Sequence, residues 1–275
     1  MAAKTHTLSV RTDGLGPVPV TYTDRGEARP FLLLHGGGGP LTVSAFADML
    51  AAERPARVVV PTHPGFAGTP RPDSLRSVAD LARLYASLLA ELDLRDVTVV
   101  GNSMGGWIAA EMALLGLSRV SSFILVDAVG ISVEGHPIAD FFSMTPRQIA
   151  EASYHDPDRY GIDPAKLPPE AREAMAANRV TLAVYAGSEM NDRTLASRLS
   201  AVAAPTLVLW GGSDRIVDPE YGRAFAVAIP AAEFQVLPHS GHLPQIETPL
   251  QLLDAIWTFT ESRAATGKAS IDGGT

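Results

Sequence analysis

The sequence contains no cysteine among its 275 residues. This excludes disulfide bonds, thiolate zinc sites and a cysteine nucleophile, although it does not define the redox compartment. Basic residues are also scarce, 22 against 30 acidic ones, which gives a formal net charge of -8 and an isoelectric point near 5.3. Nucleic acids and anionic membranes attract basic surfaces, so we expect neither as a partner.

Long apolar runs are missing as well. No segment is apolar over the roughly 20 residues that a helix needs to cross a bilayer. The stretch "MAAKTHTLSVRTDG" lacks the apolar centre of a signal peptide, so we expect a cytoplasmic protein. The hydrophobic fraction of 46% and the charged fraction of 19% are those of an ordinary globular chain, long enough for one large α/β domain.

What the chain does contain is an alternation of short apolar runs with helix-like segments. Such alternation predicts a mostly parallel sheet covered by helices on both faces. We expect strands over residues 7–11, 18–23, 31–35, 57–61, 97–100, 122–128, 206–211 and 233–238, and helices over 44–52, 74–92, 104–115, 219–228 and 249–260.

The alternation stops between residues 131 and 201. This stretch holds the proline-rich "GIDPAKLPPEAR" and helix-like pieces at 172–185 and 194–199. Structureless loops of this length are uncommon, so we expect a helical cap at 131–201 inserted into a core made of 1–130 and 202–263. A long crossover carrying two helices is the alternative. The small, polar residues 264–275 predict a flexible tail.

The segment "GNSMG", residues 101–105, fits the pattern G-x-S-x-G and has a strand before it and a helix after it. This context predicts a strained corner that exposes the Ser103 hydroxyl above the carboxyl end of the sheet. The N-terminus of the following helix would direct free N–H groups and partial positive charge at a developing oxyanion. The alternative is a glycine-lined packing corner in which Ser103 only caps the helix.

A serine nucleophile needs a base, and a base needs an orienting acid. His242 in "LPHSGHLPQIETP" follows an expected strand, with His239 as its rival. A metal site on both histidines lacks a supporting carboxylate pattern, so we expect no metal. For the acid, Asp214 follows the strand "TLVLWG", and Asp127 at the end of "FILVD" competes with it. Asp218 precedes a proline and is typical of a helix N-cap.

Together these motifs resemble the α/β-hydrolase family over about residues 18–262. "LLLHGGGGP" is similar to the family's oxyanion loop, "GNSMGG" to its nucleophile elbow, and "GGSDRIV" and "GHLPQIETP" to its acid and histidine loops. The resemblance implies an α/β-hydrolase fold, a triad of Ser103, His242 and Asp214, and hydrolysis without a cofactor. It also implies an oxyanion hole formed by the backbone N–H groups of Gly37 and Met104, with Gly38 as a near rival.

The resemblance leaves the substrate open. A serine argues against relatives that cleave carbon–halogen bonds or epoxides with an aspartate nucleophile. Hydrolases of carbon–carbon bonds in ring-fission dienoic acids share the glycine-rich motifs, but they typically carry tryptophan after the histidine, where this chain has Leu243. We therefore expect a small ester or lactone as substrate. Carbon–carbon cleavage, acyl transfer and a non-catalytic ligand-binding role remain alternatives.

The expected pocket lies between the core and the cap. Aromatic and sulfur-containing side chains of the cap suggest an apolar or aromatic acyl group, although they could equally form the cap's own core. The candidates for the pocket lining are Gly38, Phe141, Phe142, Met144, Tyr185, Met190 and Leu243. Arg179 and Arg193 could receive a substrate carboxylate. His63 stands where the family usually has aspartate, and we interpret it as structural.

Overall fold

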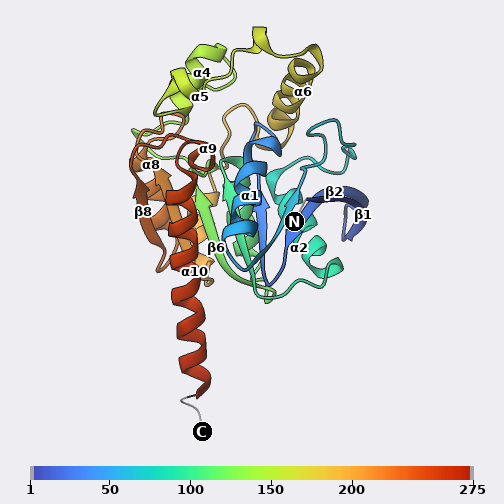
Figure 1. Cartoon of the computed structure of the whole chain (residues 1–275), viewed down its shortest axis with the longest axis vertical. Helices are drawn as coiled ribbons and strands as arrows, with labels where there is room; N and C mark the ends of the chain where they lie inside the picture. Colours follow the sequence, from blue (N-terminus) through green and yellow to red (C-terminus); the bar gives the residue numbers. More distant parts are fainter. Residues whose placement is uncertain (1–2, 273–275) are drawn as a thin grey trace.

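A computed structural model describes the backbone of residues 3–272 and the side chains of residues 3–263. The described strands form one sheet in the order β1-β2-β4-β3-β5-β6-β7-β8 (Figure 1). Strand β2 is antiparallel to both its neighbours, and the other neighbouring pairs are parallel. The strands are β1 (Lys4–Thr12), β2 (Gly16–Gly26), β3 (Arg29–Leu34), β4 (Ala56–Pro61), β5 (Val97–Asn102), β6 (Val120–Val126), β7 (Thr206–Gly211) and β8 (Glu233–Leu237).

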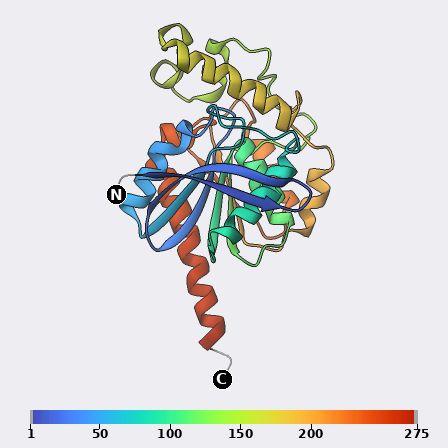
Figure 2. The same cartoon turned by 90° about the vertical axis from the view of Figure 1, so that its right-hand side faces the viewer.

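Helices cover both faces of the sheet (Figure 2). One face carries α1 (Leu41–Glu53) and α10 (Pro249–Asp272), and the other carries α2 (Val78–Glu91), α3 (Met104–Leu114) and α8 (Pro219–Ala228). Successive side chains of a strand point to opposite faces. Phe31 and Leu33 therefore join the core beneath α1 and α10, while Leu32 and Leu34 join the core on the other face. Burial on both sides explains why the central strands are continuous apolar runs.

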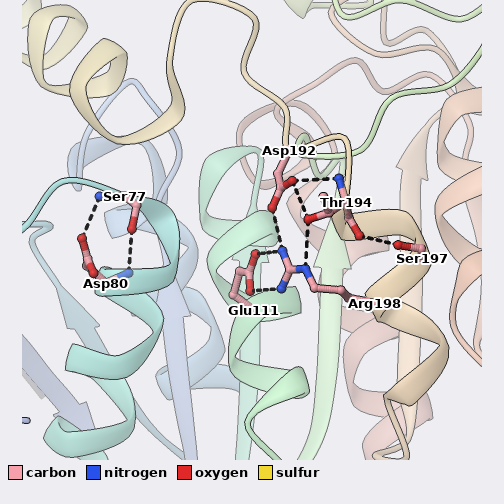
Figure 3. A network of polar contacts seen from close by, with 7 residues as sticks. All are labelled: Ser77, Asp80, Glu111, Asp192, Thr194, Ser197 and Arg198. Carbon is pink, nitrogen blue, oxygen red and sulfur yellow. Dashed lines mark hydrogen bonds and ion pairs between the residues drawn. The ribbon is translucent and has the colours of Figure 1, made fainter.

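The expected alternation is confirmed, and differences lie at the ends of elements. Helix α8 has the expected bounds. For α2, expected from residue 74 with either Ser74 or Ser77 as the N-cap, the structure has Ser77 as the N-cap and Val78 as the first helical residue. The Ser77 hydroxyl accepts the Asp80 N–H at 3.2 Å and the Asp80 carboxylate accepts the Ser77 N–H at 3.0 Å, so this reciprocal cap defines the helix start (Figure 3). Helix α10 continues through the first part of the expected tail to Asp272 and extends away from the body (Figure 1). Residues 273–275 lie outside the described residues.

Between β6 and β7 the chain forms only helical elements and loops, apart from an isolated bridge between Gly130 and Asn191. We call residues 131–201 the insert. Figure 1 shows its helices α4, α5 and α6 above one end of the sheet. The insert contains α4 (Pro146–Ser153), α5 (Pro157–Tyr160), the 3-10 helix η1 (Pro164–Lys166), α6 (Pro169–Ala186), α7 (Leu195–Arg198) and the 3-10 helix η2 (Leu199–Ala201).

An ion-pair network joins the end of the insert to α3 (Figure 3). The Arg198 guanidinium donates to both carboxylate oxygens of Glu111, at 2.8 and 2.7 Å, and to Asp192 at 2.7 Å. The Glu111 side chain is only 8% exposed, so Arg198 supplies the countercharge for a nearly buried carboxylate. Asp192 also accepts the Thr194 N–H, which begins the turn into α7. The network therefore attaches the insert to the helix that follows Ser103.

Replacing Arg198 by methionine should lower the free energy of unfolding by about 2 kcal/mol, because Glu111 would remain charged without a partner in a nearly buried position. Urea unfolding followed by circular dichroism measures this loss. The matched control is Arg193→Met, whose ion pair with Glu189 is exposed and 3.7 Å long. We expect the control to change stability by less than about 0.5 kcal/mol, and equal losses in the two variants would contradict a special role for the network.

Candidate active site

Ser103 lies at the corner between β5 and α3 with φ of 57° and ψ of -120°, a conformation rare for a residue other than glycine. Two glycines permit this corner. A Cβ atom on Gly101 would lie 2.1 Å from the Gly105 carbonyl oxygen, and one on Gly105 would lie 2.2 Å from the Leu34 oxygen. The Ser103 hydroxyl makes no hydrogen bond to α3, so it does not cap the helix. The corner instead leaves the hydroxyl without a partner among the described residues.

His242 and Asp214 come together although 28 positions separate them. His242 Nδ1 donates to Asp214 Oδ2 at 2.7 Å, and both side chains are buried. Asp214 Oδ1 accepts the N–H groups of Ile216 at 2.8 Å and Val217 at 3.2 Å, which orient the carboxylate. Because Nδ1 carries its proton toward the carboxylate, Nε2 is the ring nitrogen that can accept another proton.

The rival residues have other partners. His239 is exposed, and its ring lies 5.2 Å from the His155 ring, on the surface. Asp218 accepts the Tyr221 N–H at 2.9 Å and caps α8, as its sequence context indicated. Asp127 is fully buried and accepts the Gly211 N–H at 2.7 Å. Among the described acids, Asp214 is therefore the one hydrogen-bonded to His242.

Ser103 and His242 line one cavity of about 400 Å³ between the end of the sheet and the insert. No hydrogen bond joins the two side chains among the described residues, and contacts of this kind often tighten only when substrate is bound. Five of the expected lining residues face the cavity: Gly38, Phe141, Met144, Met190 and Leu243. The other two do not. Phe142 packs edge-on against Phe141, and the Tyr185 hydroxyl donates to the Pro64 oxygen at 2.9 Å.

The glycine loop after β3 lies between Ser103 and α6. A Cβ atom on Gly36 would lie 2.9 Å from the Ser103 Cβ, and one on Gly37 would lie 2.6 Å from Leu182 Cδ2. Gly37 lines the cavity, so its backbone is close to any bound molecule. The Met104 side chain is buried in the core, and its backbone begins α3, where helix N–H groups lack partners within the helix. The site therefore combines a hydroxyl, an imidazole paired with a carboxylate, and backbone donors.

The family of this chain follows from its match to a known protein family. The model of the "Alpha/beta hydrolase family" matches residues 31–255, most of the chain. The chain belongs to the α/β-hydrolase family. Similar proteins include 2-hydroxy-6-oxo-6-(2'-aminophenyl)hexa-2,4-dienoic acid hydrolase of Metapseudomonas resinovorans, 26% identical over 93% of this chain and 92% of that protein. Lipase 1 of Psychrobacter immobilis is 28% identical over 83% of this chain and 76% of that protein.

Among solved structures, a thermophilic esterase from Thermogutta terrifontis superposes with a TM-score of 0.74 at 25% identity, covering 95% of this chain and 99% of that one. The α/β-hydrolase fold expected from the sequence is therefore confirmed. No helix among the residues described here is long and apolar enough to cross a membrane.

In this α/β hydrolase, α6 contacts both the glycine loop and the loop that follows β4, and sequence reasoning missed these contacts. The Asn178 amide oxygen accepts the Ala67 N–H at 2.9 Å, and the Thr181 hydroxyl donates to the Gly65 oxygen at 3.0 Å. Leu182 packs on Gly37. Residues 178, 181, 182 and 185 share one helical face, so their spacing could have revealed a buried stripe. That spacing does not reveal which residues the stripe contacts. The hydrogen-bond partners of Asn178, Thr181 and Tyr185 lie 111 to 121 residues earlier in the chain.

Three polar residues of the quoted motifs also position the histidine loop. The Asn102 amide donates to the His242 oxygen at 2.9 Å, and the amide of Gln245 donates to the Asn102 side-chain oxygen at 3.0 Å. Glu247 accepts the N–H groups of Gly241 at 2.6 Å and His155 at 3.0 Å. Asn102 therefore links the serine corner to the histidine loop, and Glu247 links that loop to the insert.

His35 and His63 form a buried pair beneath the glycine loop, with ring centroids 3.7 Å apart. His35 Nδ1 donates to the Gly36 oxygen at 2.7 Å, and its Nε2 accepts the His63 N–H at 3.1 Å. His63 Nε2 donates to the His35 oxygen at 2.8 Å, and its Nδ1 accepts the Tyr85 hydroxyl at 2.6 Å. Each ring therefore has one donating and one accepting nitrogen, and both rings are neutral. This agrees with the structural role expected for His63.

Burial lowers the pKa of His35 to about 4 and also lowers the pKa of His63. The unfolded chain binds these protons below the ordinary histidine pKa, whereas the folded protein excludes them, so stability falls as the pH falls. For His35 alone the loss between pH 6.5 and pH 4 should be on the order of 3 kcal/mol. Urea unfolding across this range tests the prediction.

The control is His155→Gln, which removes an exposed histidine that lies outside the buried pair. His35→Gln should flatten the slope between pH 6.5 and pH 5. A wild-type protein whose stability stays constant over that interval would contradict the prediction, because the two rings would then bind protons as readily in the folded protein as in the unfolded chain.

Proposed function

We propose that this α/β hydrolase is a serine hydrolase that cleaves small carboxylic esters or lactones through an acyl-enzyme on Ser103. The observation that carries the proposal is the His242–Asp214 hydrogen bond at 2.7 Å beside a cavity that Ser103 also lines. A hydroxyl, an imidazole and an oriented carboxylate in one site match by role the three groups of nucleophilic acyl transfer. The similarity to an esterase and a lipase supports the same reaction class.

The reaction would begin when His242 Nε2 takes the hydroxyl proton of Ser103 as Oγ attacks the carbonyl carbon. Asp214 holds the imidazole in the required tautomer and stabilises its charged form. The negative oxygen of the tetrahedral intermediate would be bound by the backbone N–H groups of Met104 and Gly37, with Gly38 as the alternative to Gly37. His242 then gives the proton to the leaving alkoxide, and water repeats the sequence to release the acid.

The cavity walls support an apolar acyl group. The insert contributes Phe141, Met144 and Met190 to the lining, and Leu243 follows His242 on the core side. These side chains would exclude water from the acyl-enzyme except at the attacking position, which favours an apolar or aromatic small molecule. In this proposal the insert acts as a cap over Ser103.

Labelling with a fluorophosphonate tests the nucleophile directly. Wild type should be modified at Ser103, as mapped by mass spectrometry, and Ser103→Ala should show neither labelling nor turnover of an aryl ester. Asp214→Asn should reduce kcat by roughly 10⁴-fold, because the amide favours the wrong imidazole tautomer. A folded wild-type protein without labelling would favour a ligand-binding role, and full activity of Ser103→Ala would refute the assignment.

A second candidate is hydrolysis of a carbon–carbon bond in a dienoic acid, and one observation favours it. Arg172 and Arg179 of α6 line the cavity, and neither forms an ion pair with a described carboxylate. Arg179 donates instead to the Phe141 oxygen at 2.8 Å. Guanidinium groups without a carboxylate partner in a largely apolar cavity suit a substrate that carries a carboxylate. A dienoic acid hydrolase is among the similar proteins. Arg193, the other arginine expected to bind a carboxylate, pairs with Glu189 and does not line the cavity.

Arg172→Met should separate the two candidates. If the substrate is a dienoic acid, KM should rise about 10-fold or more with this variant, because one charge-assisted contact is lost. KM for a neutral aryl ester should change less than about 2-fold, as should both KM values in the control Arg193→Met. Hydrolysis of the ester with no turnover of any dienoate would leave the esterase proposal alone.

A further inference from the structure

We infer that Asp127 is a positioning residue: its carboxyl group stays neutral and donates a hydrogen bond to Asp214, which in turn orients His242. The inference rests on the proposed function for its catalytic meaning. The arrangement of the two carboxyl groups can be tested without any activity, as described below.

The geometry around Asp127 leaves one oxygen without a partner. Asp127 directly follows β6 with φ of 47°, and its side chain is fully buried. Its Oδ1 accepts the Gly211 N–H at 2.7 Å, whereas Oδ2 is buried and has no hydrogen-bond partner. Buried polar atoms rarely stay unpaired, so this oxygen requires an explanation.

The neighbouring groups supply one. Ligand-type atoms of Asp127, Asp214 and His242 all lie within 4.8 Å of one another. Two carboxylates this close, buried and without an arginine or lysine partner among the described residues, cannot both stay ionised at moderate cost. One of them must therefore hold a proton or share a cation.

The hydrogen-bond donors decide which carboxyl group keeps its charge. Asp214 accepts from Ile216, Val217 and His242, which stabilises its ionised form. Asp127 accepts only from Gly211. Burial, and next the charge of Asp214, raise the pKa of Asp127 well above its ordinary value. The proton belongs on Oδ2, the unpartnered oxygen, and Asp214 is the nearby acceptor for it.

A neutral donor beside Asp214 has a consequence for the site. Additional hydrogen bonding makes the Asp214 carboxylate less basic, so the proton between it and His242 stays on Nδ1. Asp127 thereby acts on the reaction through Asp214 and needs no contact with substrate.

The first experiment is infrared difference spectroscopy of wild type against Asp127→Asn at neutral pH. Asparagine tolerates positive φ and keeps both a carbonyl acceptor for Gly211 and an N–H donor for Asp214. Wild type should show the carbonyl stretch of one protonated carboxyl group that the variant lacks. A difference spectrum with only a lost carboxylate band would overturn the inference, because Asp127 would then be ionised.

Kinetics with a turned-over ester gives the second test. Asp127→Asn should keep kcat within about 3-fold and leave the pH profile unchanged, whereas Asp127→Gly, which suits the positive φ but removes the donor, should lower kcat about 10-fold or more at constant KM. Thermal unfolding checks that both variants fold. A loss in Asp127→Asn as large as that in Asp214→Asn would instead identify Asp127 as a second charged acid.

Two further results separate the possible failures. The purified protein could contain one metal ion per chain, and a chelator could remove both the ion and the activity. This result would overturn the inference, because a cation and not a proton would then lie between the two carboxyl groups. If Ser103 is not labelled and no substrate is turned over, the proposed function fails, but the infrared band still decides the state of Asp127.

Discussion

The structure depends on how closely the backbone of α3 approaches the ends of β3 and β5. At Gly101 and Gly105 an added Cβ atom would lie 2.1 and 2.2 Å from neighbouring carbonyl oxygens, so the helix can start directly above the sheet only with glycine at both positions. This contact imposes positive φ on Ser103 and raises its side chain out of the core. The burial of the strand before Ser103 and of the helix after it offsets the conformational strain of this residue.

The second constraint is that the insert contacts α3, the glycine loop and the histidine loop, all of which lie around Ser103. Arg198 pairs with Glu111 on α3, Leu182 packs on Gly37, and Glu247 bonds both to the histidine loop and to the first turn after α4. These attachments fix the position of the cavity walls relative to Ser103. Small changes in the insert can therefore alter the shape of the cavity without disturbing the sheet.

Charge is distributed in the buried part of the site so that each ionised group has donors. Asp214 has two backbone donors and an imidazole, and Glu111 has a guanidinium. His35 and His63 avoid charge by using each ring once as donor and once as acceptor. These donors are needed because an unpaired charge in a low-dielectric interior costs several kcal/mol. Asp127 accepts a single backbone N–H, and we therefore propose that its carboxyl group is neutral.

Much of the architecture follows from local pattern. Apolar runs of strand length, helices with capping residues and the glycines around Ser103 predicted the order of the elements and the α/β fold, because period and turn chemistry are properties of neighbouring residues. The resemblance to the α/β-hydrolase family, together with loop position, also indicated Asp214 and His242. Boundaries were less predictable: Ser74 and Ser77 both suited the N-cap of α2, and the structure uses Ser77, whose hydrogen bonds with Asp80 are reciprocal.

The sequence by itself determined the fold, the strained serine corner and a short list of candidate partners for it. Only the tertiary structure shows which candidates lie together: His242 is hydrogen-bonded to Asp214, whereas His239 lies on the surface and Asp127 accepts a backbone N–H. It also decided that Phe141 faces the cavity while Phe142 and Tyr185 do not. The physical reason is that direction and distance between side chains on different loops depend on how strands and helices pack, and residues far apart in sequence carry no local signal of that packing.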